Sequence, residues 1–357
     1  MRISLLAIMT ALTTFTTATM TNAATVAIVA PQSGPYALLG QQVFEGARAA
    51  AEASGHSVVE FPESCEAGDS TELGARLADA GAVAAIGFLC TETLTDALPS
   101  LAEAKIPAIT LAVRGKILME DALREGWPLY RMAPAEGDEG QTMSEVIFAR
   151  WKAEPIAIID DGTIYGRELA GAVRQHIEAG GISPVFVDTY RPGQEQQVAL
   201  VRRLQKAGAS HVVVGGDRND VAVIARDAEE ENIPLTLLAG DTMRAADRPV
   251  ALRPGVMAVA TPDYAAFPQA ADATTALRAR DLEPEGYVLP AYAAVQAVDQ
   301  ALAEGGETDL SSAIGAGRFE TVTGVITFNE RHELSETPLR LQEWQDGRFV
   351  TTDTPTE

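Results

Sequence analysis

Cysteine and hydroxyl side chains gather where one apolar segment of the chain ends. The segment AAIGFLCTETL, residues 84–94, runs from small apolar residues into Cys90, Thr91 and Thr93. Cys65 is the other of the two cysteines. A pair of cysteines in a chain whose first residues mark it as exported favours a disulfide over a metal site. We therefore expect Cys65 and Cys90 to form a disulfide, which stabilises the fold by about 3 kcal/mol in the chain-entropy model.

Thr91 is placed to do one of two things. It directly follows an apolar strand pattern and opens a helical pattern. Its hydroxyl could cap the helix, which is the commoner fate of such a residue. A backbone N–H at the same helix terminus could instead hold an anion such as a carboxylate. Both interpretations stay open at this stage.

Motifs of the common enzyme classes are absent from the sequence. It contains no G-x-S-x-G, no GxxxxGK[ST] phosphate loop and no GxGxxG that opens a helix. Asp160-Asp161-Gly162 is followed by nothing else of a calcium loop. The histidines have no metal-like spacing and stand at His56, His176, His211 and His332. We expect a protein that is not an enzyme and carries no cofactor or metal.

The hydropathy pattern and the net charge of the chain limit the class of protein. Residues 1–23 combine a positive start, an apolar stretch and small residues, as a cleavable signal peptide does. No later run approaches the roughly 18 apolar residues of a membrane span. A formal net charge of −23 and a pI near 4.5 argue against nucleic acid as a partner. We expect an exported protein that is soluble in its mature form.

Strand and helix patterns alternate along the chain, and the alternation restarts near residues 131–138. Continuous apolar runs separated by helices are typical of parallel sheets covered on both faces. The first series has expected strands at 25–30, 58–61, 83–89 and 106–110, and helices at 41–54, 71–80 and 91–104. The second has strands at 155–160, 185–188, 211–214 and 235–238, and helices at 167–179, 198–207 and 220–230. Strands at 256–260 and 324–328, helices at 287–304 and 311–316, and an edge strand at 339–344 follow.

These patterns predict an α/β fold of two doubly wound, Rossmann-like parallel-sheet lobes joined by a multi-stranded hinge. The last segments are too few for a third domain, so we expect them to return to the two lobes. The expected division is 24–133 plus 263–331 for the N-terminal lobe and 134–262 plus 332–357 for the C-terminal lobe. Ligands of such sheets bind beyond the carboxyl ends of the strands.

Several segments, in this order, carry a resemblance to a known family. They are QSGPYALLGQQVFEGARAA, ESCEAGD, GFLCTETL, DGTIYG, VVVGGDRNDVAVIARDA, YAAVQAVDQAL and GVITFNERHEL. Together they resemble the periplasmic leucine/isoleucine/valine-binding proteins, which have the type I periplasmic binding protein fold. The resemblance covers residues 25 to about 349. It implies the solute-binding component of an ABC importer, with permease subunits as partners and a small molecule such as an amino acid as ligand. It also implies a monomer that is located in the periplasm.

The resemblance also implies roles for individual residues. The residue after the second cysteine, here Thr91, holds the ligand carboxylate through its hydroxyl and N–H. The backbone carbonyl of Ala112 accepts from the ligand ammonium, and Asp241 pairs with that ammonium by a charge-assisted hydrogen bond. Tyr165 matches an aromatic residue that covers the ligand from the second lobe. Leu89 is a further candidate for contact with the ligand.

Three departures from the family pattern bear on the ligand. Leu39 and Asp217 each stand where the family has a tyrosine, and Arg114 replaces a threonine. A pocket with these residues is more polar than an aliphatic side chain needs. We therefore expect a polar or charged ligand, with Asp217 on a donor group and Arg114 on a carboxylate. Alternatively, Arg114 turns outward beside Lys116, and Asp217 pairs with Arg218 or caps the helix expected from Asp220.

The expected mechanism is hinged closure around the ligand, with the rotation absorbed near residues 131–134, 260–264 and 329–334. The alternative function is a ligand-sensing module that acts through a separate signalling partner, because fold alone does not fix function.

Overall fold

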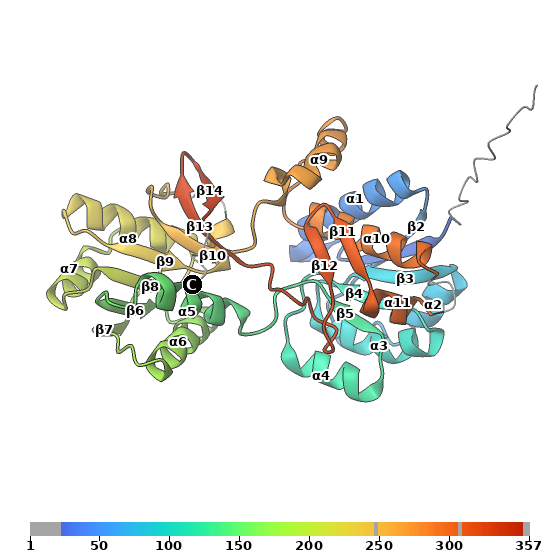
Figure 1. Cartoon of the computed structure of the whole chain (residues 1–357), viewed down its shortest axis with the longest axis horizontal. Coiled ribbons are helices and arrows are strands. Elements are labelled where there is room, and N and C mark those ends of the chain that lie inside the picture. Colours follow the sequence, from blue (N-terminus) through green and yellow to red (C-terminus); the bar gives the residue numbers. More distant parts are fainter. Residues whose placement is uncertain (1–22, 246–248, 306–308, 353–357) are drawn as a thin grey trace, which may run out of the picture.

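The structure is a computed structural model that describes residues 23–245, 249–305 and 309–352. The signal peptide expected over residues 1–23 lies outside these ranges apart from its last position. Within them, no helix has the length and apolar character that a membrane span requires. Two α/β lobes stand side by side and are joined by thin connecting segments (Figure 1).

The first lobe is built on a five-stranded parallel sheet with the strand order β2-β1-β3-β4-β5. Alternate residues of each strand point to opposite faces, so Val26 and Ile28 pack on one side and Ala27 and Val29 on the other. Both faces are covered by helices, which makes the lobe doubly wound. The strands are β1 (Thr25–Ala30), β2 (Ser57–Pro62), β3 (Ala82–Gly87), β4 (Ala108–Thr110) and β5 (Leu129–Arg131). The helices are η1 (Gly34–Tyr36), α1 (Ala37–Ser54), α2 (Leu73–Asp79), α3 (Thr91–Ala104) and α4 (Lys116–Glu125).

The second lobe has a seven-stranded sheet with the order β14-β13-β10-β9-β8-β6-β7. Its strands β6 to β10 are parallel, and β13 and β14 add an antiparallel pair at one side. The strands are β6 (Ile156–Asp160), β7 (Phe186–Thr189), β8 (His211–Gly215), β9 (Thr236–Ala239), β10 (Met257–Ala260), β13 (Arg340–Gln345) and β14 (Arg348–Thr351). The helices are α5 (Asp138–Arg150), α6 (Ile164–Ala179), α7 (Val198–Lys206), α8 (Arg218–Glu230) and the 3-10 turn η2 (Asp241–Arg244).

The predicted fold class is confirmed, with one local correction. The strand expected at the edge, 339–344, is β13, which pairs with β10 on one side and β14 on the other. The edge strand is therefore β14, whose four residues follow the turn at Asp346 and Gly347. Trp344 and Phe349 face each other across this hairpin, with ring centroids 5.0 Å apart.

Segments late in the sequence complete the first lobe. Helix α10 (Val288–Ala303) lies against α1, and the approach is so close that a Cβ on Gly46 would lie 1.9 Å from the Val288 carbonyl oxygen. The other returning elements are η3 (Tyr264–Ala266), η4 (Pro268–Ala270), α9 (Ala271–Arg278), α11 (Leu310–Ala316) and the hairpin of β11 (Arg318–Thr321) and β12 (Gly324–Thr327).

The chain thus passes between the two sheets three times, through 132–137, 261–263 and 328–339. We keep the division of the lobes at these segments as a proposal.

A buried ion pair joins the end of β5 to the third crossing. Arg131, the last residue of β5, is 1% exposed, and its Nη2 donates to Glu333 in the third crossing. Its Nη1 donates to the carbonyls of Arg114 at 2.6 Å and Gly115 at 3.1 Å. The backbone adds a bond from Arg131 N to His332 O at 2.9 Å. The end of β5, the third crossing and the loop after β4 are therefore connected to one another. We call the end of β5 and the third crossing the hinge.

Candidate functional site

A cavity of about 720 Å³ lies between the two lobes beside the crossings. It is lined from the first lobe by the start of α1 and the loop after β4, and from the second lobe by η2. All three crossings, the hairpin β11–β12, the segment 264–267 and the start of α10 also contribute to the lining. Its apolar lining includes Leu38, Leu39, Tyr264, Phe267, Tyr287 and Val325, and its charged lining consists of Arg114, Asp241, Arg244, Glu285, Glu336 and Arg340.

Four of the eight residues expected at the ligand line this cavity. They are Leu39, Ala112, Arg114 and Asp241. Leu89, Thr91, Tyr165 and Asp217 are not among its lining residues, and their surroundings are described below. The structure thus brings Leu39, Ala112, Arg114 and Asp241 together between the lobes. Their role in ligand binding is a proposal.

Arg114 and Asp241 meet directly across the gap between the lobes. Arg114 follows β4 in the first lobe, and its Nη2 donates to Asp241 Oδ2 at 2.7 Å in the second. The side chains are 40% and 18% exposed. Burial lowers the pKa of the Arg114 guanidinium, but the Asp241 carboxylate outweighs this and leaves the pKa above its ordinary value. The orientation of Arg114 is therefore inward, toward the second lobe.

The Asp241 carboxylate also binds the second crossing. Its Oδ1 accepts from Thr261 N at 3.0 Å and from Thr261 Oγ1 at 3.1 Å. Arg244 holds the same crossing, since its Nη1 donates to the Thr261 carbonyl and hydroxyl and to the Pro262 carbonyl. Both oxygens of Asp241 are thus engaged within the protein.

Glu139 lies behind this pair and was not anticipated from the sequence. It occupies the first turn of α5, is 8% exposed, and accepts from Tyr165 Oη at 2.6 Å and from Asp241 N at 2.7 Å. Burial raises the pKa of the Glu139 carboxyl, and the two donors offset this in part. Acidic residues are common in the first turn of any helix, so the sequence carries no signal of this role.

Glycine at position 240 permits this close arrangement. A Cβ there would lie 1.8 Å from Glu139 Oε1 and 2.4 Å from Tyr165 Oη. Tyr165 is consequently fixed by Glu139, packs against the apolar cluster of α5 and α6, and has its pKa raised by burial and by the Glu139 charge.

Thr91 is the first residue of α3, and its side chain is exposed. The N-cap position belongs to Cys90, so the alternative that Thr91 is the N-cap is wrong.

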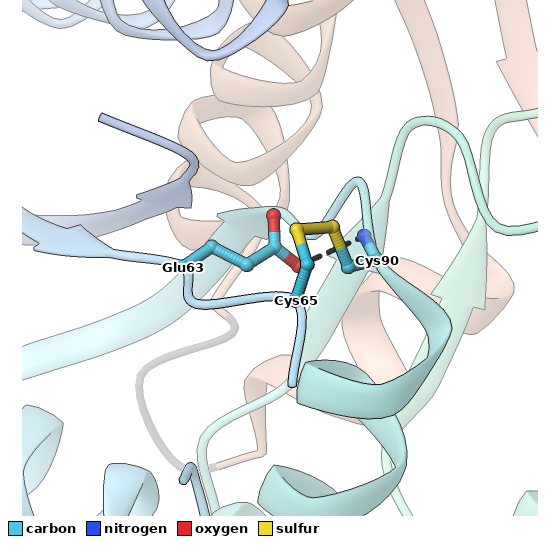
Figure 2. A group of neighbouring side chains, drawn as sticks. All are labelled: Glu63, Cys65 and Cys90. Atoms are coloured by element: carbon cyan, nitrogen blue, oxygen red, sulfur yellow. Dashed lines mark hydrogen bonds between the residues drawn. A yellow bond between two sulfur atoms is a disulfide. The ribbon is translucent and has the colours of Figure 1, made fainter. Parts of the chain in front are cut away.

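The backbone amides of the two residues before Thr91 donate hydrogen bonds to a carboxylate of the protein itself. Glu63, which is 5% exposed, accepts from Leu89 N and Cys90 N, each at 2.9 Å. Figure 2 shows Glu63 beside the amide of Cys90. An acidic group at this helix terminus is favoured by the helix dipole.

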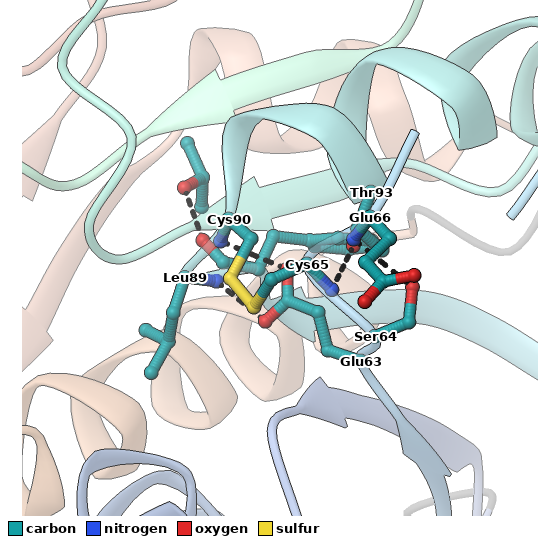
Figure 3. Close-up of a disulfide and its surroundings, with 9 residues drawn as sticks. Glu63, Ser64, Cys65, Glu66, Leu89, Cys90 and Thr93 are labelled. Carbon is teal, nitrogen blue, oxygen red and sulfur yellow. Dashed lines mark hydrogen bonds between the residues drawn. A yellow bond between two sulfur atoms is a disulfide. The ribbon is translucent and has the colours of Figure 1, made fainter. Parts of the chain in front are cut away.

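The predicted disulfide between Cys65 and Cys90 is present, and it fixes the loop that carries Glu63. Thr93 Oγ1 accepts from Cys65 N at 3.2 Å beside it (Figure 3). Glu63 and the two cysteines form the only metal-like cluster in the part of the chain that the structure describes. Because both sulfurs belong to the disulfide, neither is available as the thiolate that a metal would require.

Asp217 caps helix α8. Its carboxylate accepts from Asp220 N at 3.1 Å, and its side chain is exposed at the carboxyl end of β8. This matches the capping alternative, although α8 begins at Arg218 and not near Asp220. The Arg218 guanidinium points elsewhere, with its Cζ 4.6 Å from the centre of the Trp344 ring.

Comparisons with known proteins place these features in context. The sequence signature of the family described as "Periplasmic binding protein" matches residues 23–348. The chain is 26% identical over 343 residues to the Leu/Ile/Val-binding protein homolog 3 of Brucella melitensis biotype 1, covering 91% of this chain and 92% of that protein.

Solved structures with the same fold include the following two. A putative branched-chain amino acid ABC transporter from Rhodospirillum rubrum superposes with a TM-score of 0.79 at 16% identity, covering 93% of this chain and all of the other. A solute binding protein of an ABC transporter from Rhodopseudomonas palustris HaA2, in complex with p-hydroxybenzoic acid, gives 0.68 at 18% identity, with coverage of 92% and 95%.

Proposed function

The chain belongs to the periplasmic binding protein family, and on this premise we propose that it is the extracytoplasmic solute-binding protein of an ABC importer. Its ligand is an amino acid or a related small polar molecule, bound between the two lobes. The family match and the resemblance to the Brucella protein support this function, and neither suggests a chemical conversion of the ligand.

One observation carries the proposal. The cavity between the lobes takes side chains from both of them, with Ala112 and Arg114 on one side and Asp241 on the other. Its volume, about 720 Å³, falls within the range of small-molecule sites. A ligand that contacts both walls stabilises the closed arrangement, because its differential affinity shifts the equilibrium between open and closed lobes.

Individual residues have the following proposed roles. Arg114 binds the ligand carboxylate, and the Ala112 carbonyl accepts from a ligand donor. Leu39 contacts the ligand body. Thr91, Leu89, Tyr165 and Asp217 lie outside the cavity in this arrangement, so they can contact a ligand only after the lobes rotate.

The partners and location follow from the same proposal. We propose that residues 1–23 direct export to the periplasm and that the mature chain acts as a monomer on the permease subunits of its importer. Light scattering after size exclusion tests the monomer, and a dimer mass would contradict it.

Thermal unfolding of the mature chain, refolded to remove carried-over ligand, tests the binding function. The panel holds amino acids, their deaminated analogues and other small polar compounds. A ligand at about a hundred times its Kd stabilises by about 2.7 kcal/mol, which moves Tm by a few degrees. The proposed function requires that at least one compound raises Tm in a concentration-dependent way. That compound should be recovered chemically unchanged after the experiment. No shift across the whole panel, or turnover of the compound, would contradict it.

A further inference from the structure

We propose that the ligand is a carboxylate without an amino group, and that Arg114 is the residue that excludes the amine. The inference rests on the proposed solute-binding function and narrows its ligand class. It assigns Asp241 a role different from the one implied by the resemblance, namely to anchor Arg114.

The first support is the state of the Asp241 carboxylate. Both of its oxygens already accept hydrogen bonds, Oδ1 from Thr261 and Oδ2 from Arg114 at 2.7 Å. A ligand ammonium at Oδ2 would meet the Arg114 guanidinium as a like charge at hydrogen-bond range. Like charges at such distance repel strongly in a partly buried site. The guanidinium therefore stands where the ammonium would need to be.

Arg114 is held in this place by its backbone. Its carbonyl accepts from Arg131 Nη1 at 2.6 Å and from Glu136 N at 3.0 Å. Arg131 is in turn paired with the hinge residue Glu333. The backbone of Arg114 is thus fixed to the hinge. This favours the contact of the Arg114 side chain with Asp241 over an outward orientation.

Glu139 does not offer a replacement partner for an ammonium. Its Oε1 is taken by Tyr165 Oη and Asp241 N, and its Oε2 lies 3.9 Å from Arg114 Nη1. It is buried and does not line the cavity. The other acids of the lining, Glu285 and Glu336, are exposed.

The donors that remain free in the lining suit an anion. Arg244 uses only Nη1 in the hydrogen bonds described above, and in the described part of the chain its Nε and Nη2 form none. Among the residues that the structure describes, Arg114 likewise donates a hydrogen bond only through Nη2. Guanidinium groups bind carboxylates through paired donors. The apolar lining of Leu38, Leu39, Tyr264, Phe267 and Tyr287 then accommodates a hydrocarbon or aromatic body.

The test compares molecules that differ only in the amine. Calorimetric titration of the ligand-free mature chain uses leucine against 4-methylpentanoate and phenylalanine against 3-phenylpropanoate. We expect the deaminated member of at least one pair to bind at least tenfold more tightly than its amino acid. If amino acids bind as tightly or more tightly, the inference is wrong while the solute-binding function stands. If nothing in the wider panel binds, both are wrong.

A variant pair shows whether Arg114 is the cause. Arg114→Gln leaves Asp241 without its guanidinium partner, so the preference should move at least tenfold toward the amino acid of the same pair. Lys116→Gln removes one positive charge two positions away, at the first residue of α4. Lys116 lies outside the cavity lining, so this variant should keep the wild-type preference. An unchanged preference in folded Arg114→Gln would overturn the assignment.

Discussion

Arg114 in the first lobe and Asp241 in the second are joined by a hydrogen bond of 2.7 Å between Nη2 and Oδ2. The bond spans the cavity, and one partner follows β4 while the other follows β9. Two residues that line opposite sides of the cavity are therefore in contact with one another. The pair links the lobes at a point distinct from the three crossings.

Removing this contact should separate the lobes. A partly exposed ion pair contributes about 1 kcal/mol, which changes an equilibrium between open and closed lobes about fivefold. We expect ligand-free Arg114→Gln to have a larger radius of gyration than the wild type in small-angle X-ray scattering. Lys116→Gln, at the first residue of the following helix α4, is the control and should match the wild type. Equal radii in all three proteins would show that the pair does not hold the lobes.

The buried hinge pair should matter more to stability. Arg131→Met removes the buried guanidinium, 1% exposed, that pairs with Glu333. Loss of one partner of a buried pair lowers the free energy of unfolding by about 3–5 kcal/mol, measured by urea denaturation. Arg331→Gln is the matched control, because Arg331 lies 3.6 Å from the same carboxylate but is half exposed. That variant should lose less than about 1 kcal/mol, and a similar loss in both would contradict the prediction.

Glu63 should make stability depend on pH. Burial raises its pKa from 4.5 to about 7, and the amides of Leu89 and Cys90 oppose the rise only in part. The folded state therefore holds a proton that the unfolded state releases between these values. Its contribution is fully present below pH 4.5 and is lost as pH rises through 7, by roughly 3 kcal/mol in all.

Urea denaturation between pH 4.5 and 8 measures this contribution. The wild type should lose more stability over the range than Glu63→Gln, which cannot ionise. Glu66→Gln, an exposed residue of the same loop, should follow the wild type. Parallel curves for the wild type and Glu63→Gln would refute the prediction.

Gly240 should not tolerate a side chain. In Gly240→Ala the new methyl group would meet Glu139 and Tyr165, so we expect a loss of about 1–3 kcal/mol in the free energy of unfolding. Gly171→Ala provides the comparison, since it lies within helix α6 with nothing within 4 Å of a Cβ. Alanine there should be neutral or stabilising by up to about 1 kcal/mol. If denaturation finds both variants equally stable, the contact at Gly240 is not restrictive.

Much of the fold could be predicted because its strands are continuous apolar runs. The helix expected at 91–104 has those bounds, and β1 occupies the expected 25–30. Elements with weak patterns were not anticipated: α4 and α5 carry charged residues on much of their surface, and β5 has only three residues. Strand β14 was missed because its pairing with β13 depends on a short turn late in the chain.

The site could be predicted only in part, because it depends on contacts between distant segments. From their positions in the motifs, Leu39, Ala112, Arg114 and Asp241 were predicted as site residues, and they line the cavity. They did not indicate that Arg114 and Asp241 bind each other, since these residues are 127 positions apart. Glu63 was missed for the same reason, because its acceptor role arises only when the loop after β2 folds against the start of α3.

The late return of α10 to α1 bears on the order in which the chain can fold as it is synthesised. The face of α1 that includes Val43, Ala47 and Ala50 is buried in the cluster to which residues 288–301 contribute. Until residues 288–301 have been synthesised, this apolar face of α1 lacks the residues that cover it in the folded protein. The second sheet likewise waits for β13 and β14. Neither lobe can reach its final core during most of translation, a delay that is compatible with the proposed export of the chain before it folds.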